Sequence, residues 1–304
     1  MAVGAGRMTE GPPLRGALRS LSRLAWRRPW LKAIGQLLPP LGAFVVVYVA
    51  ALVALLITGF WTTDEFTNEV VRVWNLGNFH DLIHTPAWRT VTLRTVAIAS
   101  AVTVTCAVLA VPYAYFMVRI ASPRVRVALL VASTLPLWVS YLVRVYSWRL
   151  ILNPDGALNW TFAKLGLPQQ NILYSNTALW LVFTYIWFPF MVLPVYSALE
   201  RVPGSYLEAS ADLGGRALTT FRRIVLPLAL PGIAAGSIFT FSLTLGDYIA
   251  PSLVGGTNSQ LIGSTIYSNF QLNLPFAAAF STVPLIIMAA YVTLMKRLGA
   301  FENL

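Results

Sequence analysis

The chain has 304 residues, of which 57% are apolar and only 11% are charged. Soluble domains carry about 45–50% apolar and about 25% charged residues, so this chain has too few charges to cover a water-soluble core. Its composition therefore excludes an ordinary soluble enzyme, a disordered chain and a soluble nucleic-acid-binding protein, and it indicates an integral membrane protein. The net charge of +11 must be explained by where the basic residues lie.

Six apolar stretches are long enough to cross the roughly 30 Å hydrocarbon core of a bilayer, which takes about 20 residues of helix. We predict that all six are transmembrane helices, because an isolated segment satisfies its own backbone hydrogen bonds in lipid only as a helix. The alternating segments of about ten residues that a β-barrel needs are absent from the sequence. The protein is thus predicted to be an all-α integral membrane protein. The six predicted spans are residues 41–60, 95–118, 127–152, 179–198, 224–246 and 276–295.

Arginines and lysines lie mainly in four segments: before the first span, between the second and third, between the fourth and fifth, and after the sixth. In a six-span chain these segments share one side of the membrane, which the positive-inside rule assigns to the cytoplasm. Both termini are therefore predicted to be cytoplasmic. The loops on the other side carry acidic and basic residues in nearly equal number, so the basic character sets orientation and does not indicate nucleic-acid binding.

Residues 1–38 form a basic N-terminal segment ahead of the first predicted transmembrane helix, residues 39–60. Leucines and arginines interleave in this segment at helical spacing, which is typical of an amphipathic helix on the inner leaflet. The alternative is a basic tail that contributes only to orientation. The apolar run of the first span is too long for a signal peptide, and Trp61 follows it where a cleavage site needs small residues. We therefore predict a retained helix.

The cytoplasmic loop between the fourth and fifth spans, residues 200–223, has the pattern of two short helices. We expect Ser205 to cap a helix that starts at the next residue, with Glu208 at the capping-box position. The glycine pair that begins at Gly214 is expected to end this helix, because glycine readily adopts the left-handed conformation of a helix C-cap. A second short helix, residues 218–224, then leads into the fifth span.

Seven residues of this region have the spacing Glu-Ala-(Ala/Ser)-x3-Gly-x9-Ile-x-Leu-Pro. They are Glu208, Ala209, Ser210, Gly214, Ile224, Leu226 and Pro227. The pattern resembles the "EAA" signature of permease subunits of bacterial ABC importers, which have the type I, MetI-like fold. The resemblance implies that the loop, with Asp212 and Arg216, is a coupling helix that docks into a cleft of an ATPase subunit. An ordinary helix–turn–helix linker would explain the glycine but not the whole register.

Two further stretches, residues 136–159 and 241–263, are similar to the spermidine/putrescine branch of these permeases. This similarity implies a polyamine or a similar small cation as the solute. Relatives for ferric ion, for opine- or amino-acid-like solutes and for anions share similar stretches, so these solutes are the alternatives. A second hypothesis for the function is a stand-alone channel or secondary carrier. A third is a membrane-embedded enzyme, but such an enzyme would need clustered catalytic acids or histidines at one interface, and the sequence has none.

The resemblance also implies an assembly in the bacterial inner membrane. Its expected members are a second, distinct permease, two ATPase subunits and an extracytoplasmic solute-binding protein. The five-helix permease core would correspond to residues 88–298. The sequence has no Gly-x4-Gly-Lys-Ser/Thr loop, so ATP and magnesium are expected on the ATPase subunits, and this chain is expected to bind no cofactor and to have no enzymatic activity of its own.

Asp247 is the acidic residue that lies near the outer end of a predicted span, and ionisable residues at such positions suggest function. A carboxylate there could attract the ammonium groups of a polyamine, and nearby aromatic faces could stabilise them. The candidate aromatic residues are Tyr248, Tyr141, Tyr146, Trp138 and Trp148. Alternatively, the aromatic residues are interfacial anchors, and Asp247 caps its helix or pairs with Arg144 or Arg149. Those arginines would otherwise favour an anionic or zwitterionic solute or contact the binding protein.

A metal site in the first outer loop is a weaker possibility. His80 and His84 are one helical turn apart beside Asp81, which is suitable spacing for two ligands, but the sequence offers no third ligand at useful spacing. The single cysteine, Cys106, lies in the middle of a predicted span and is interpreted as a packing residue.

Overall fold

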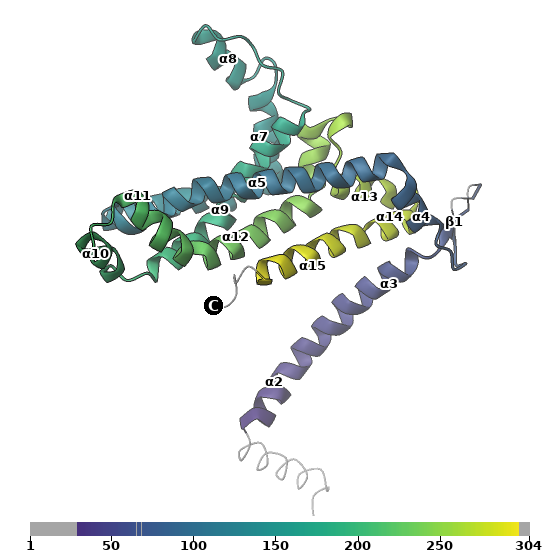
Figure 1. Cartoon of the computed structure of the whole chain (residues 1–304). Helices are drawn as coiled ribbons and strands as arrows, with labels where there is room; N and C mark the ends of the chain where they lie inside the picture. The colour runs from purple at the N-terminus through teal and green to yellow at the C-terminus, as the bar shows by residue number, and fades with distance from the viewer. Residues whose placement is uncertain (1–28, 65, 68, 298–304) are drawn as a thin grey trace, which may run out of the picture. The chain divides into compact units, whose positions relative to one another are not determined.

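The computed structural model describes residues 29–64, 66–67 and 69–297 (Figure 1). The first 28 residues of the predicted basic N-terminal segment lie outside the described residues. The chain divides into two compact units, residues 1–57 and 58–304, and each is described by itself.

The first unit is an apolar helix that confirms the first predicted span. It consists of α2 (Pro29–Phe44), a π-helical turn η1 (Val45–Val49) and α3 (Ala50–Thr58). The part long and apolar enough to cross a membrane is Gln36–Thr58, with a mean hydropathy of 2.7. It begins before the predicted start because α2 continues through two prolines, which a membrane helix tolerates more readily than a soluble one.

The second unit begins with a short outer segment. Strand β1 (Thr62–Thr63) pairs antiparallel with β2 (Val70–Val71), and helix α4 (Gly77–His84) follows. The side-chain amide of Asn78 donates to the carbonyl oxygens of Gly59 and Trp61, at 3.0 and 2.8 Å. These two bonds hold α4 beside the residues that precede β1.

Three long helices pack together at the centre of the second unit: α5 (Pro86–Arg119), α9 (Asn176–Glu200) and α12 (Leu226–Gly246). Helices α9 and α12 approach so closely that a Cβ at Gly232 would lie 2.5 Å from the carbonyl oxygen of Pro194. Only glycine fits there, as is common where membrane helices pack through small residues. Large side chains fill the rest of the core. The largest fully buried ones on these helices are Met117, Leu179, Phe183, Ile186, Met191 and Leu199.

The third predicted span is not one continuous helix, so the expectation of a single uninterrupted helix over residues 127–152 is wrong. Helix α6 (Pro123–Thr134) and the 3-10 turn η2 (Leu135–Trp138) form one arm, and α7 (Tyr141–Leu152) with α8 (Ala157–Lys164) forms the other. The two arms are bent by 97°. Pro136 has no backbone N–H for a continuous helix, and Val139, which follows η2, is extended. Figure 1 shows α7 and α8 projecting from the long axis of α5.

The other predicted spans are confirmed as helices. The second lies within α5, the fourth within α9, the fifth within the continuous stretch Ala217–Gly246 and the sixth within Leu274–Arg297. The described residues contain five helices that could cross a membrane, or six if the bent pair counts as one. The remaining elements are η4 (Pro251–Gly255), η5 (Thr257–Ser259), α13 (Ile262–Phe270), α14 (Leu274–Phe280) and α15 (Thr282–Arg297).

Candidate functional site

Two short helices form a hairpin between α9 and α12. They are α10 (Ser205–Asp212) and α11 (Ala217–Thr220). The expected side-chain cap at Ser205 is wrong, because α10 begins at Ser205 itself and its N-cap is Gly204, which has no side chain to accept a hydrogen bond. The first backbone N–H groups are satisfied instead by the preceding turn, where Glu208 donates to the carbonyl of Gly204 at 3.2 Å.

The end of α10 confirms the expected glycine stop. Gly214 has a φ of +75°, a conformation that costs an L-residue with a side chain about 1–2 kcal/mol. Its N–H donates to the carbonyl of Ala211 at 2.9 Å, and the N–H of Gly215 donates to that of Ser210 at 2.8 Å. These two bonds form a Schellman motif, which turns the chain sharply towards α11.

Gly214→Ala is therefore expected to loosen the hairpin. An alanine there has open space around it, so the cost comes only from the positive φ and amounts to about 1–2 kcal/mol. The population of the opened hairpin should rise about 5- to 30-fold, which the initial rate of trypsin cleavage at Arg216 would measure. Gly204→Ala is the matched control, since Gly204 also has open space but a negative φ. Equal cleavage rates for the two variants would contradict the expectation.

The serine of the motif holds the two helices of the hairpin together. The Ser210 hydroxyl lies 2.7 Å from the Thr220 hydroxyl across the turn. A Cβ at Gly215 would lie only 2.5 Å from the Ser210 hydroxyl oxygen, so these two positions need small residues. Within this chain, Ser210 thus has a structural contact that the sequence pattern alone does not reveal.

The hairpin joins the fifth span without a break. Helix α11, the π-helical turn η3 (Phe221–Val225) and α12 form one helix, Ala217–Gly246, of 30 residues. Phe221 packs edge-on against Tyr115 of α5, with ring centres 5.8 Å apart. Pro227 lies in the first turn of α12 and does not interrupt this helix. The hairpin and the fifth predicted span are therefore parts of one continuous helix.

The outward face of the hairpin is open to another molecule. Glu208, Ala209 and Asp212 are exposed, and the Leu213 side chain is 90% exposed. Between α10 and the start of α12 lies a groove of about 890 Å³. The groove residues include Ser210, Leu213, Gly214, Arg216, Arg223, Ile224 and Pro227. Among the described residues, none of these arginines or acids forms an ion pair within the chain.

A second cluster lies at the other end of α12. The carboxylate of Asp247 accepts a hydrogen bond from the Tyr141 hydroxyl of α7 and, at 2.9 Å, one from the backbone N–H of Ala250. The Arg144 guanidinium lies over the Tyr141 ring, 5.7 Å from its centre. Among the described residues neither Arg144 nor Arg149 pairs with Asp247, so that alternative is wrong for this arrangement. The carboxylate caps the helical turn that follows it and not the end of α12, so the bond observed differs from the expected cap on its own helix.

The other predicted aromatic residues do not gather around Asp247. Trp138 is 90% exposed on η2, Tyr146 is exposed on α7, and Trp148 packs against Tyr185 of α9. Tyr248 stacks on Tyr267 of α13, with ring centres 4.4 Å apart. Tyr267 was not predicted, because nothing in the sequence links it to Asp247. Arg149 donates to the hydroxyl of Tyr174 at 3.2 Å.

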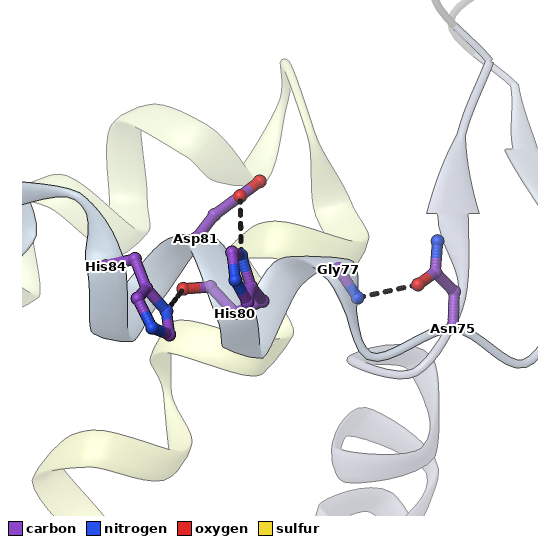
Figure 2. A network of polar contacts seen from close by, with 5 residues as sticks. All are labelled: Asn75, Gly77, His80, Asp81 and His84. Carbon is purple, nitrogen blue, oxygen red and sulfur yellow. Dashed lines mark hydrogen bonds and ion pairs between the residues drawn. The ribbon is translucent and has the colours of Figure 1, made fainter.

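The histidines of the outer loop form a local network without a third metal ligand. Figure 2 shows the His80 and His84 rings stacked on α4, with ring centres 4.0 Å apart. His84 Nδ1 lies 2.9 Å from the His80 carbonyl, and His80 Nδ1 lies 3.8 Å from the Asp81 carboxylate. Among the described residues no group of three histidines, cysteines or acids is placed to hold a metal. Cys106 is buried, with its sulfur 3.6 Å from the Thr184 carbonyl, as expected of a packing residue.

Comparison with known proteins connects these features to a family. Residues 110–300 match the family model described as binding-protein-dependent transport system inner membrane component. The inner membrane ABC transporter permease protein YdcU of Escherichia coli is 46% identical over 96% of this chain and 97% of its own length. The spermidine/putrescine transport system permease protein PotB of Escherichia coli is 34% identical over 81% of this chain and 90% of its own.

The fold agrees with this relationship. A chain from the crystal structure of a bacterial alginate ABC transporter, in complex with an alginate pentasaccharide-bound periplasmic protein, superposes with a TM-score of 0.73. The two chains are 16% identical, and the match covers 88% of this chain and 93% of that one. The chain therefore belongs to the binding-protein-dependent transport system inner membrane components, and it is a permease subunit of an ABC importer with the MetI-like fold.

Proposed function

We propose that this permease forms, with a second and distinct permease, the path by which a polyamine-type solute enters a bacterial cell. The observation that carries the proposal is the exposed hairpin of α10 and α11 at the end of a continuous helix of 30 residues. Such a helix is about 45 Å long, at 1.5 Å per residue, so it reaches across a bilayer. A protein that moves the hairpin would thereby move the other end of the fifth span.

The motor that moves the hairpin is a pair of separate ATPase subunits, which bind ATP and magnesium. The docking residues on this chain are the exposed Glu208, Ala209 and Asp212, the protruding Leu213 and the arginines of the groove. In this proposal the hairpin and both termini lie in the cytoplasm, and Asp247 lies on the side where a solute-binding protein delivers the cargo.

The solute class follows from Asp247 and from the relatives. PotB is named for spermidine and putrescine, whereas the name of YdcU specifies no solute. In this chain the Asp247 carboxylate and the stacked Tyr248 and Tyr267 lie near the end of α12. A carboxylate and aromatic faces are the groups that stabilise ammonium ions, so a di- or polyamine fits this chemistry.

Reconstitution tests this proposal. The chain is combined in proteoliposomes with the second permease, the ATPase and the solute-binding protein encoded beside it, and uptake of labelled spermidine and putrescine is measured. Uptake is expected only when all components and ATP are present. Uptake by this chain alone would contradict the importer mechanism. ATP-driven uptake of an amino acid, an iron chelate or an anion, without polyamine uptake, would contradict only the solute class.

A further inference from the structure

Arg144 is a buried cation whose guanidinium has a ring contact but too few hydrogen-bond acceptors. The residue is only 9% exposed, and two of its three guanidinium nitrogens, Nε and Nη1, are buried without a hydrogen bond to any residue that the structure describes. A guanidinium stays protonated in proteins, so it cannot relieve this cost by losing its charge. A buried charge without a partner is strongly unfavourable, which implies that Arg144 has a partner in another state of the protein.

Asp247 shares a contact residue with Arg144. Its present partner, Tyr141, lies on the same helix as Arg144, and the guanidinium already rests over the Tyr141 ring. Residues three apart lie on one face of a helix, so Tyr141 and Arg144 are adjacent on α7. A small shift of α7 against the end of α12 would therefore replace the hydroxyl of Tyr141 with the guanidinium of Arg144.

Both elements that carry these residues have a local hinge. Helix α7 follows the 97° bend, where Val139 and Ser140 are extended. Asp247 is the first non-helical residue after α12, with a φ of −72° and a ψ of 133°. The other end of the same continuous helix carries the cytoplasmic hairpin. The hairpin and Asp247 thus lie at opposite ends of one continuous helix.

We propose that Asp247 is a two-position latch, bonded to Tyr141 in the arrangement described here and to Arg144 when the ATPase subunits have closed on ATP. This inference rests on the proposed function, because it needs a motor that moves the hairpin. In the first position Arg144 is unpaired and Asp247 has a neutral hydrogen-bond donor. In the second position the two charges pair. The latch gives the fifth span two discrete positions and assigns Arg144 a positioning role in transport.

Cross-linking of cysteine pairs in the complete transporter, with a short bifunctional thiol reagent, tests the latch. A reagent is needed because the long Tyr, Arg and Trp side chains hold the Cβ atoms of each pair too far apart for a direct disulfide. In a Cys106→Ala background, one protein carries Arg144→Cys with Asp247→Cys, and another carries Tyr141→Cys with Asp247→Cys. Trapping the ATP-bound state with vanadate is expected to raise the yield of the first cross-link at least about fivefold and to lower that of the second. The control pair, Thr105→Cys with Trp180→Cys, joins α5 and α9 at a 3.0 Å hydrogen bond and should not change.

Charge variants give a second measurement, because the cysteine pairs remove the charges themselves. Arg144→Met is expected to lower the maximal uptake rate about tenfold or more, the factor expected for a lost charge-assisted hydrogen bond, with assembly unchanged. Arg144→Lys keeps a cation and should retain most of the uptake. Wild-type uptake by Arg144→Met, or cross-link yields that ignore nucleotide while the native transporter hydrolyses ATP and imports, would overturn the latch alone. Failure of the native transporter to couple uptake to ATP would overturn the proposed function.

Discussion

Glu208→Lys is expected to abolish solute uptake while the permease still folds and inserts. In the structure Glu208 is exposed on α10 and forms no ion pair with any described residue, so the substitution breaks no contact inside the chain. Its effect is expected at the proposed contact with the ATPase, where the substitution replaces an acidic group with a basic one. Charge reversals at such contacts cost about 2–5 kcal/mol, which corresponds to a loss of uptake and of ATPase co-purification well above tenfold.

Asp155→Lys is the matched control for this prediction. It makes the same change of charge at an exposed residue on the other side of the predicted membrane, between α7 and α8. This variant should bind the ATPase and import solute as the native protein does. Normal co-purification of the ATPase with Glu208→Lys would show that α10 is not the docking helix.

Asp247→Asn is expected to lower polyamine uptake about tenfold or more, because it removes the negative charge at the outer end of α12. The asparagine keeps the size of the side chain and one of its acceptor oxygens, so the link to Tyr141 or to the N–H of Ala250 can persist. Asp247→Glu retains the charge and should transport better than Asp247→Asn. Uptake is measured in proteoliposomes as a function of solute concentration.

The kinetic form of this loss separates two roles of Asp247. If the carboxylate contacts the ammonium groups of the solute, the half-saturating solute concentration rises. If it acts as the latch, the maximal rate falls and the half-saturating concentration changes little. Native values of both parameters for Asp247→Asn would remove Asp247 from the transport mechanism.

Hydropathy located the helices well but could not show their bends. The third predicted span is apolar enough along its length, yet the chain turns by 97° between η2 and α7. Averaging over a window of residues hides Pro136, and only the packing of α7 against α9 and η4 gives the second arm its direction. The start of α10 was also predicted one residue too late. The helix begins at Ser205, and its N-cap is therefore Gly204.

In the candidate sites, local features were predictable from the sequence, whereas contacts between distant residues were not. Gly214 was predictable because the positive φ at a helix end strongly favours glycine. The bond between Tyr141 and Asp247 was not, because 106 residues separate them and no local pattern records which helix faces which. The lack of acceptors for Nε and Nη1 of Arg144 was equally unpredictable, because it depends on which polar groups the elements packed around Arg144 carry.

The amino-acid sequence by itself determined that this protein lies in a membrane, where its helices are and which loop carries the permease signature, because hydropathy and short-range spacing are properties of neighbouring residues. The tertiary structure decided that the signature loop continues without a break into the fifth span, that the third span is bent, and that Asp247 bonds to Tyr141. It also decided that two guanidinium nitrogens of Arg144 are buried without an acceptor among the described residues. These features arise from the packing of distant segments, and free energies of packing depend on three-dimensional contacts that a linear pattern does not encode.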